Sequence, residues 1–307
     1  MAEFVRIFEA GARDGLQSEK QTVDTEVKLE LIRRLAAAGL KQIEGTAFVS
    51  PKWVPQMADH AEVMARLPTA SEFPGVTYPV LTPNLQGFEA AVTAGATEVG
   101  VFAAASEAFS QKNINCSIAE SLARFEPIFA RAQALGVRVR GYVSCVIACP
   151  YDGAVAPGKV AEVARHLHQA GCYEVSLGDT IGVGTPPTIV AMLEAVAAQV
   201  PLSQLAGHYH DTYGMGIANV HASYQFGLRT FDSSVAGMGG CPFARGATGN
   251  VATEDVVYLM QGLGAETGVD LDRLVDCAAW ISAQFGRPPH SRVARAMLAK
   301  RMAGACA

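Results

Sequence analysis

Two histidines separated by a single residue, His208 and His210, could together hold a metal ion. Side chains two residues apart on a strand point to the same side, so both imidazoles can face one site. With the carboxylate of Asp14 and the amide oxygen of Asn250 they make a mixed nitrogen and oxygen set. Such a set suits Mg²⁺, Mn²⁺ or another divalent ion that keeps open water positions. The alternative is a pair of histidines hydrogen-bonded at a polar strand end.

Three other residues could act on a substrate beside such an ion. Arg13 follows an apolar run and directly precedes Asp14, although an ordinary surface ion pair is the alternative. Glu44 lies inside another apolar run, where an unpaired carboxylate is costly to bury, so we expect it to pair with a cation such as Arg13. Cys241 stands in a glycine-rich loop where a thiol can be exposed and mobile, with a buried or incidental cysteine as the alternative.

These residues are spread along a chain that alternates short apolar runs with longer amphipathic segments. In the longer segments, apolar residues recur at steps of three and four, which is the helix period. Examples are 25–39, 117–136 and 157–171, each of which ends in a glycine of the kind that follows a helix. The short runs, read as strands, are VRIFEAG (5–11), QIEGTAF (42–48), VTYPVLT (76–82), EVGVFAAA (98–105), VRVRGYVSC (137–145), YEVSLGDT (173–180), LAGHYHDT (205–212) and TFDSSVAG (230–237).

Eight strands that each lead into a helix must run parallel, and repeated right-handed crossovers close them into a barrel. We therefore predict an α/β fold, a (β/α)8 TIM barrel with extra C-terminal helices. A doubly wound open sheet is the alternative, but it would ordinarily need a G-x-G-x-x-G turn, which GARDG (11–15) is not. No linker divides the chain, so residues 1–307 are predicted to form one domain. Within it, about 265–307 would add two helices that cap the barrel or serve a subunit contact.

The strand ends decide where chemistry can occur, because barrels of this kind place their active sites at the C-terminal ends of the strands. Five predicted strands end in ionisable or ligating groups. The residues named above are among them, and Asp179 ends the sixth strand. One mouth of the barrel is therefore predicted to hold them all.

The composition excludes several classes of protein. Half of the 307 residues are apolar and 17% are charged, which rules out a disordered chain. With 24 Lys and Arg against 29 Asp and Glu, the net charge is −5, and the dispersed basic residues argue against a nucleic-acid surface. No run reaches the ~18 apolar residues of a membrane helix, and no signal-peptide layout opens the chain. The seven cysteines are scattered, with Cys306 a stray thiol near the C-terminus, so we predict a reduced, cytoplasmic protein.

Eight long segments share the order and character of one enzyme family. They are GARDGLQSEK (11–20), IEGTAFVSPKWVPQMADH (43–60), YPVLTPNLQGFEAA (78–91), KNINCS (112–117), GYVSCVIACPY (141–151), SLGDTIGVGTP (176–186), HYHDTYG (208–214) and AGMGGCPFARGATGNVATEDVVY (236–258). Together they resemble the 3-hydroxy-3-methylglutaryl-CoA lyase family, metal-dependent aldol and Claisen-type enzymes on a (β/α)8 barrel. The resemblance covers nearly the whole chain.

This resemblance implies a reaction, a cofactor and a role for each residue. The reaction is cleavage of (S)-3-hydroxy-3-methylglutaryl-CoA to acetoacetate and acetyl-CoA, as in leucine degradation and ketone-body formation, by a dimer with Mg²⁺ or Mn²⁺. The implied metal ligands are Asp14, His208, His210 and Asn250. Of the implied catalytic residues, Arg13 would stabilise the enolate of the departing acetyl-CoA, Glu44 would hold the arginine and the acyl end, Cys241 would transfer a proton, and Asp179 would polarise the hydroxyl. The base is either His208 or Asp179, and Lys20, Lys112 and Asn113 would contact coenzyme A.

Departures from the family pattern leave other functions open. Ala12 replaces the usual proline, and Gly45 and Tyr209 could reshape the acyl pocket. A related lyase for 3-hydroxy-3-isohexenylglutaryl-CoA is therefore the near alternative. A pyruvate-dependent condensing enzyme or aldolase could use the same metal site, but the loop GGCPFA (239–244) favours the lyase. A non-enzymatic metal-binding or CoA-binding module is hard to reconcile with Arg13, Glu44 and Cys241 around the ion.

Overall fold

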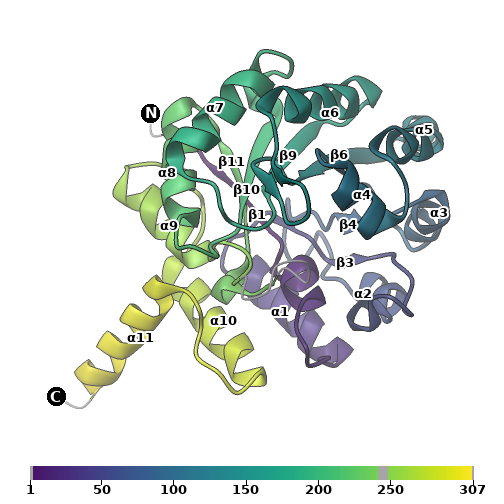
Figure 1. Ribbon diagram of the computed structural model, residues 1–307. Coiled ribbons are helices and arrows are strands. Elements are labelled where there is room, and N and C mark those ends of the chain that lie inside the picture. Colours follow the sequence, from purple (N-terminus) through teal and green to yellow (C-terminus); the bar gives the residue numbers. More distant parts are fainter. Residues whose placement is uncertain (1–2, 241–247, 306–307) are drawn as a thin grey trace.

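All eight predicted strands form, and they run parallel around a barrel that helices enclose (Figure 1). The computed structural model describes residues 3–240 and 248–305. The hydrogen-bonded strand order is β2-β1-β11-β10-β9-β6-β5-β4-β3. The strands are β1 (Arg6–Glu9), β2 (Gln42–Ile43), β3 (Thr46–Ala47), β4 (Val80–Leu81), β5 (Glu98–Ala104), β6 (Arg138–Ser144), β9 (Glu174–Asp179), β10 (Leu205–Tyr209) and β11 (Thr230–Ser233).

The sheet closes on itself at the second predicted strand. β2 and β3 are two halves of this strand, and they pair with β1 and β4 respectively. Between the halves, the Glu44 amide donates to the Glu9 carbonyl on one side at 2.8 Å, and the Gly45 amide donates to the Pro79 carbonyl on the other at 2.9 Å. The predicted barrel is therefore confirmed, and the open-sheet alternative is wrong.

Helices cover the outside of the barrel and begin and end where the sequence predicts. Ser117 and Glu120 form a reciprocal capping box at the start of α5, and Gly136 and Gly171 end α5 and α6 with φ of 68° and 116°. The helices are α1 (Thr25–Ala37), α2 (His60–Ala65), α3 (Leu85–Thr93), α4 (Glu107–Ile114), α5 (Ile118–Leu135), α6 (Pro157–Ala170), α7 (Pro186–Ala197), α8 (Gly216–Phe226), α9 (Thr253–Gly262), α10 (Leu271–Gln284) and α11 (Arg292–Ala305).

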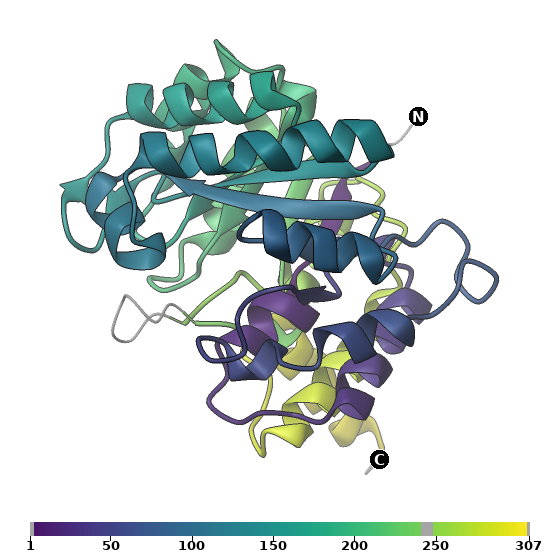
Figure 2. The ribbon, with the colours of Figure 1, turned by 90° about the vertical axis from the view of Figure 1, so that its right-hand side faces the viewer.

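The two C-terminal helices make different contacts with the barrel. α10 packs against α1, α9 and the short helix η4 (Val235–Gly237), and the Arg34 guanidinium of α1 lies 4.6 Å from the centre of the Trp280 ring. α11 contacts α9 and α10 and extends away from the barrel (Figures 1 and 2). Its start is held by Asp255, which accepts hydrogen bonds from the Ser291 hydroxyl and the Val293 amide at 2.6 and 2.9 Å.

Two local elements differ from the expected pattern. After β1, residues Gly11–Gly15 form one turn of π-helix (η1), which the sequence pattern does not predict. Such single π turns often occur at functional sites. A two-stranded hairpin, β7 (Ala148–Cys149) and β8 (Gly153–Ala154), also follows β6 where we expected only a connection.

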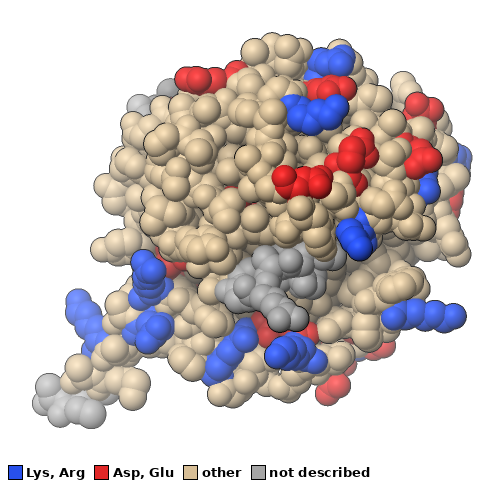
Figure 3. Space-filling model, in the orientation of Figure 1, with Lys and Arg blue, Asp and Glu red and all other residues tan. Residues whose placement is uncertain are grey.

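Within residues 3–240 and 248–305, no helix combines the length and apolar character that a membrane crossing needs. Basic and acidic side chains are interspersed over the face in Figure 3. This mixture agrees with the dispersed charges of the sequence.

Because α10 is packed into the barrel wall, its apolar face should contribute to the stability of the whole domain. Ile281 is completely buried, and Ile281→Ala is expected to lower the free energy of unfolding by about 2–5 kcal/mol. Asp276→Ala on the exposed face of the same helix removes only a surface pair with Arg301 and should cost about 0–1 kcal/mol. Urea unfolding of both variants tests this, and equal losses would mean that α10 is not part of the core.

Candidate active site

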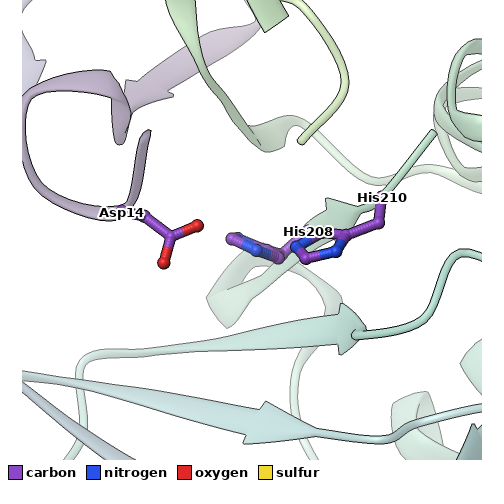
Figure 4. Close-up of side chains that lie close together, drawn as sticks. All are labelled: Asp14, His208 and His210. Carbon is purple, nitrogen blue, oxygen red and sulfur yellow. The ribbon is translucent and has the colours of Figure 1, made fainter. Parts of the chain in front are cut away.

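Asp14, His208 and His210 meet at the C-terminal mouth of the barrel (Figure 4). The two imidazoles come from the end of β10 and Asp14 from η1, and one ligand atom of each lies within 4.8 Å of the others. Asn250 joins them, because its amide donates to Asp14 Oδ2 at 2.7 Å. The structure therefore brings together all four residues that the sequence predicts as metal ligands.

The charge states of these residues fit a cation. Burial raises the pKa of Asp14, but Arg13, the two histidines and the hydrogen bond from Asn250 together outweigh burial and bring that pKa down to about 2. Burial and the neighbouring His208 lower the pKa of His210 to about 4, so its ring is neutral near pH 7. His210 Nδ1 is buried and has no hydrogen-bond partner in the described part of the chain. An ionised carboxylate and a neutral imidazole are what a divalent ion requires.

Arg13 and Glu44 form the buried ion pair that the sequence predicts. Arg13 is 6% exposed, and it donates to Glu44 Oε2 and Asp14 Oδ1, each at 2.7 Å. Burial by itself would lower the pKa of Arg13, but the Glu44 and Asp14 carboxylates together raise this pKa above its usual value. The Tyr142 hydroxyl donates to the other Glu44 oxygen at 3.1 Å. The alternative of a surface ion pair is therefore wrong, and the guanidinium is a fixed cation beside the candidate metal ligands.

Asp179 lies outside the group formed by Asp14 and the two histidines. Its Oδ2 accepts the Gly184 amide at 2.7 Å, and burial raises the pKa of this carboxyl although the amides of the loop oppose the shift. Its Oδ1 is buried without a hydrogen-bond partner among the described residues. The carboxylate thus organises the loop after β9, and of the two candidate bases only His208 lies beside Asp14.

The two substitutions that we expected to reshape the acyl pocket do not face it. Tyr209 alternates with the histidines on β10, and its hydroxyl contacts Ser223 of α8 at 2.7 Å on the outer side of the strand. A Cβ atom on Gly45 would meet Leu67 and Tyr78 at 3.7 Å, also away from Glu44. That expectation is wrong, because neighbouring strand residues point to opposite faces.

The remaining predicted residues lie at the rim or outside the described residues. Lys20 follows η1, and Lys112 and Asn113 lie on α4 after β5, and all three are exposed. They thus follow C-terminal strand ends, and their contact with coenzyme A stays a prediction. Cys241 and Cys306 fall outside the described residues.

The comparisons with known proteins agree with this geometry. Residues 4–281 match the HMGL-like family. The chain belongs to this family. It is 60% identical over 296 residues to a Pseudomonas aeruginosa protein named 3-hydroxy-3-isohexenylglutaryl-CoA/hydroxy-methylglutaryl-CoA lyase, with 96% of this chain and 98% of that protein covered. It is 58% identical over 292 residues to the mitochondrial hydroxymethylglutaryl-CoA lyase of Bos taurus, with 95% and 89% covered.

Solved structures of HMGL-like proteins share the whole barrel. The hydroxymethylglutaryl-CoA lyase of Pseudomonas aeruginosa matches with a TM-score of 0.94 at 59% identity and covers 98% of this chain and 99% of its own. An HMG-CoA lyase of Acinetobacter baumannii, solved with coenzyme A and 3-methylmalate, matches with a TM-score of 0.90 at 34% identity over 95% of both chains. The predicted family, fold and lyase class are confirmed.

Sequence reasoning missed a set of charged residues inside this HMGL-like barrel. Asp232 on β11 contacts His208 Nδ1 at 3.1 Å, and it also accepts both terminal nitrogens of Arg140 at 2.6 and 2.9 Å. Glu174 on β9 accepts from Arg140 Nε at 2.8 Å. Each of these charged residues lies inside a predicted strand, as Glu44 does. A charged residue at such a position needs a buried partner, and this pattern could have identified all three.

Asn250 depends on a tight approach between two glycines. Gly249 has φ of 89°, and a Cβ atom there would lie 2.4 Å from the backbone carbon of Gly239. Gly249→Ala is therefore expected to cost more than ~1 kcal/mol of stability and to weaken Mn²⁺ binding by displacing Asn250. Gly264→Ala is the matched control, because Gly264 has φ of 77° but nothing within 4 Å of an added Cβ.

Urea unfolding and Mn²⁺ titration followed by electron paramagnetic resonance measure both effects. The control should lose stability and keep its Mn²⁺ affinity. Unchanged Mn²⁺ affinity in Gly249→Ala would show that the contact with Gly239 does not set the position of Asn250.

Proposed function

We propose that this chain is a hydroxymethylglutaryl-CoA lyase that cleaves (S)-3-hydroxy-3-methylglutaryl-CoA to acetoacetate and acetyl-CoA. The observation that carries the proposal is the convergence of Asp14, His208 and His210 beside the buried pair of Arg13 and Glu44. The names of the relatives at 58% and 60% identity support the same substrate.

The proposed cofactor is a divalent ion, Mg²⁺ or Mn²⁺. Asp14, His208, His210 and Asn250 would hold it, and the neutral His210 ring and the ionised Asp14 fit that role. When bound, such an ion supplies Lewis acidity that lowers the pKa of the substrate hydroxyl.

The side chains would manage the charges of the reaction. A base takes the proton of the C3 hydroxyl, the bond between carbons 2 and 3 breaks, and acetoacetate leaves. The electron pair of that bond stays on the acetyl-CoA fragment as an enolate, which then takes up a proton. Arg13 would stabilise this enolate, and its contacts with Glu44 and Asp14, which hold the guanidinium in one orientation, support that role. Cys241 is the proposed proton donor to it.

The rest of the proposal concerns what binds the chain and where it works. Lys20, Lys112 and Asn113 would contact the nucleotide and pantetheine parts of the acyl-CoA, and the Acinetobacter relative solved with coenzyme A supports an acyl-CoA ligand. We propose a homodimer, for which α11 offers a surface, and a cytoplasmic location, which the name of a mouse relative at 53% identity supports.

The second candidate function is cleavage of a longer substrate, 3-hydroxy-3-isohexenylglutaryl-CoA. The name of the Pseudomonas relative at 60% identity favours it. Since Tyr209 and Gly45 face away from the site, they give no reason for a changed acyl length.

The direct test is to offer 3-hydroxy-3-methylglutaryl-CoA with Mg²⁺ and a thiol reductant, and to measure acetoacetate and acetyl-CoA. We expect equal amounts of both products, loss of activity with excess chelator, and recovery with Mg²⁺ or Mn²⁺. The isohexenyl substrate and a mixture of pyruvate with acetyl-CoA are run in parallel. Full activity in chelator would overturn the metal assignment. Turnover of the pyruvate mixture without cleavage of 3-hydroxy-3-methylglutaryl-CoA would overturn the lyase assignment.

Removing the fixed cation should affect the chemical step. Arg13→Gln is expected to lower kcat by about 10²–10³, because a donor aimed at developing negative charge contributes about 2.7–4 kcal/mol to the transition state. Arg131→Gln, which removes an exposed arginine paired with Glu89, is the control and should keep its kcat. A folded Arg13→Gln variant with the kcat of the parent enzyme would exclude Arg13 from the reaction.

A further inference from the structure

Alternating charges form an unbroken chain through the interior of the barrel, from its N-terminal end to His208. Arg6 Nη2 lies 2.6 Å from Glu174 Oε2, and Glu174 Oε1 lies 2.8 Å from Arg140 Nε. Arg140 in turn donates to both oxygens of Asp232, whose Oδ2 is 3.1 Å from His208 Nδ1. The chain therefore ends on a residue of the candidate metal site.

The central members of this chain are held rigidly. Arg140, Asp232 and Glu174 are at most 1% exposed, and the Phe8 ring centre lies 3.9 Å from the Arg140 guanidinium. Two arginines face two carboxylates, so the formal charges cancel. Buried charges persist when they are paired and hydrogen-bonded in this way, and breaking one pair is strongly destabilising.

Asp232 is fixed by more than the arginine. The Ser176 hydroxyl donates to Asp232 Oδ2 at 2.7 Å, the same oxygen that faces His208. With its Nδ1 occupied by this carboxylate, the His208 ring has only Nε2 left for a ligand beside Asp14. A carboxylate behind a metal-binding histidine fixes its tautomer and orientation and makes the free nitrogen a better ligand.

We propose that Asp232 is the positioning residue for His208, and that it acts by holding Nδ1 so that Nε2 faces the divalent ion. This inference rests on the proposed metal site and adds to it a residue that touches neither substrate nor ion. Glu174 separates this role from a purely structural one, because it also pairs with Arg140 but makes no hydrogen bond with His208.

The experiment compares Asp232→Asn with Glu174→Gln in metal-free protein titrated with Mn²⁺ and followed by electron paramagnetic resonance. Each change removes one of the two carboxylates that Arg140 contacts. In Asp232→Asn the amide has the shape of the carboxylate but no charge, and only one of its two polar atoms is an acceptor. The hydrogen bond to either Arg140 or His208 must therefore weaken. We expect Mn²⁺ to bind about 10–100-fold more weakly to Asp232→Asn and with parent affinity to Glu174→Gln.

Thermal unfolding without metal is measured on both variants and should show losses in both. Parent Mn²⁺ affinity in a folded Asp232→Asn variant would overturn the proposal, and so would an equal loss of affinity in Glu174→Gln. If Asp232→Asn does not fold, the double variant Arg140→Gln with Asp232→Asn replaces it, because it removes the two opposite charges together.

A measurement on the parent protein is independent of any variant. In ¹⁵N-histidine-labelled, metal-free protein, at a pH where the ring is neutral, we expect His208 to carry its proton on Nδ1. A proton on Nε2 would overturn the proposal. Failure of the parent protein to bind Mn²⁺ would instead overturn the metal site itself, and Mn²⁺ binding without cleavage of 3-hydroxy-3-methylglutaryl-CoA would overturn only the proposed reaction.

Discussion

The removal of charged side chains from water at one mouth of the barrel is the constraint on which the rest of the site depends. A buried ion is tolerated only where an opposite charge and hydrogen bonds compensate its lost hydration. Arg13 meets this condition with Glu44 and Asp14, and Arg140 meets it with Asp232 and Glu174. Arg13 and Arg140 are therefore each held in place by partners of opposite charge.

Backbone geometry brings these partners within reach. The π turn η1 places Arg13 and Asp14 directly after β1, and it has room because Gly11 and Gly15 bear no side chain. A Cβ atom on these glycines would lie 2.5 Å from Glu9 Oε1 and 2.8 Å from Ser234 Oγ. On the other side, Asp211 and Gly249 share a backbone hydrogen bond of 2.8 Å that ties Asn250 to the end of β10.

Strand alternation assigns each polar residue to one of two roles. Residues that point into the barrel, such as His208, Asp232 and Arg140, join the site or its supports. Residues one position away point towards the helices, as Tyr209 does with its hydrogen bond to Ser223. Asp179 follows the same rule, because Ser176, three positions earlier on β9, faces Asp232 while Asp179 holds the loop before α7. Two neighbouring residues of one strand therefore have different roles: one faces the site, and the next packs against the surrounding helices.

The sequence by itself determined the barrel, because eight apolar runs joined by helical segments can close in few other ways. It also determined the four candidate ligands and the pairing of Arg13 with Glu44, since a carboxylate inside an apolar run needs a cation. Only the tertiary structure decided which buried carboxylates support the site through hydrogen bonds to His208 and Arg140. Asp232, Arg140 and Glu174 come from three different strands, and their contacts span 34 and 92 residues of the chain. The register of parallel strands, which no local pattern records, is what brings such distant charges together.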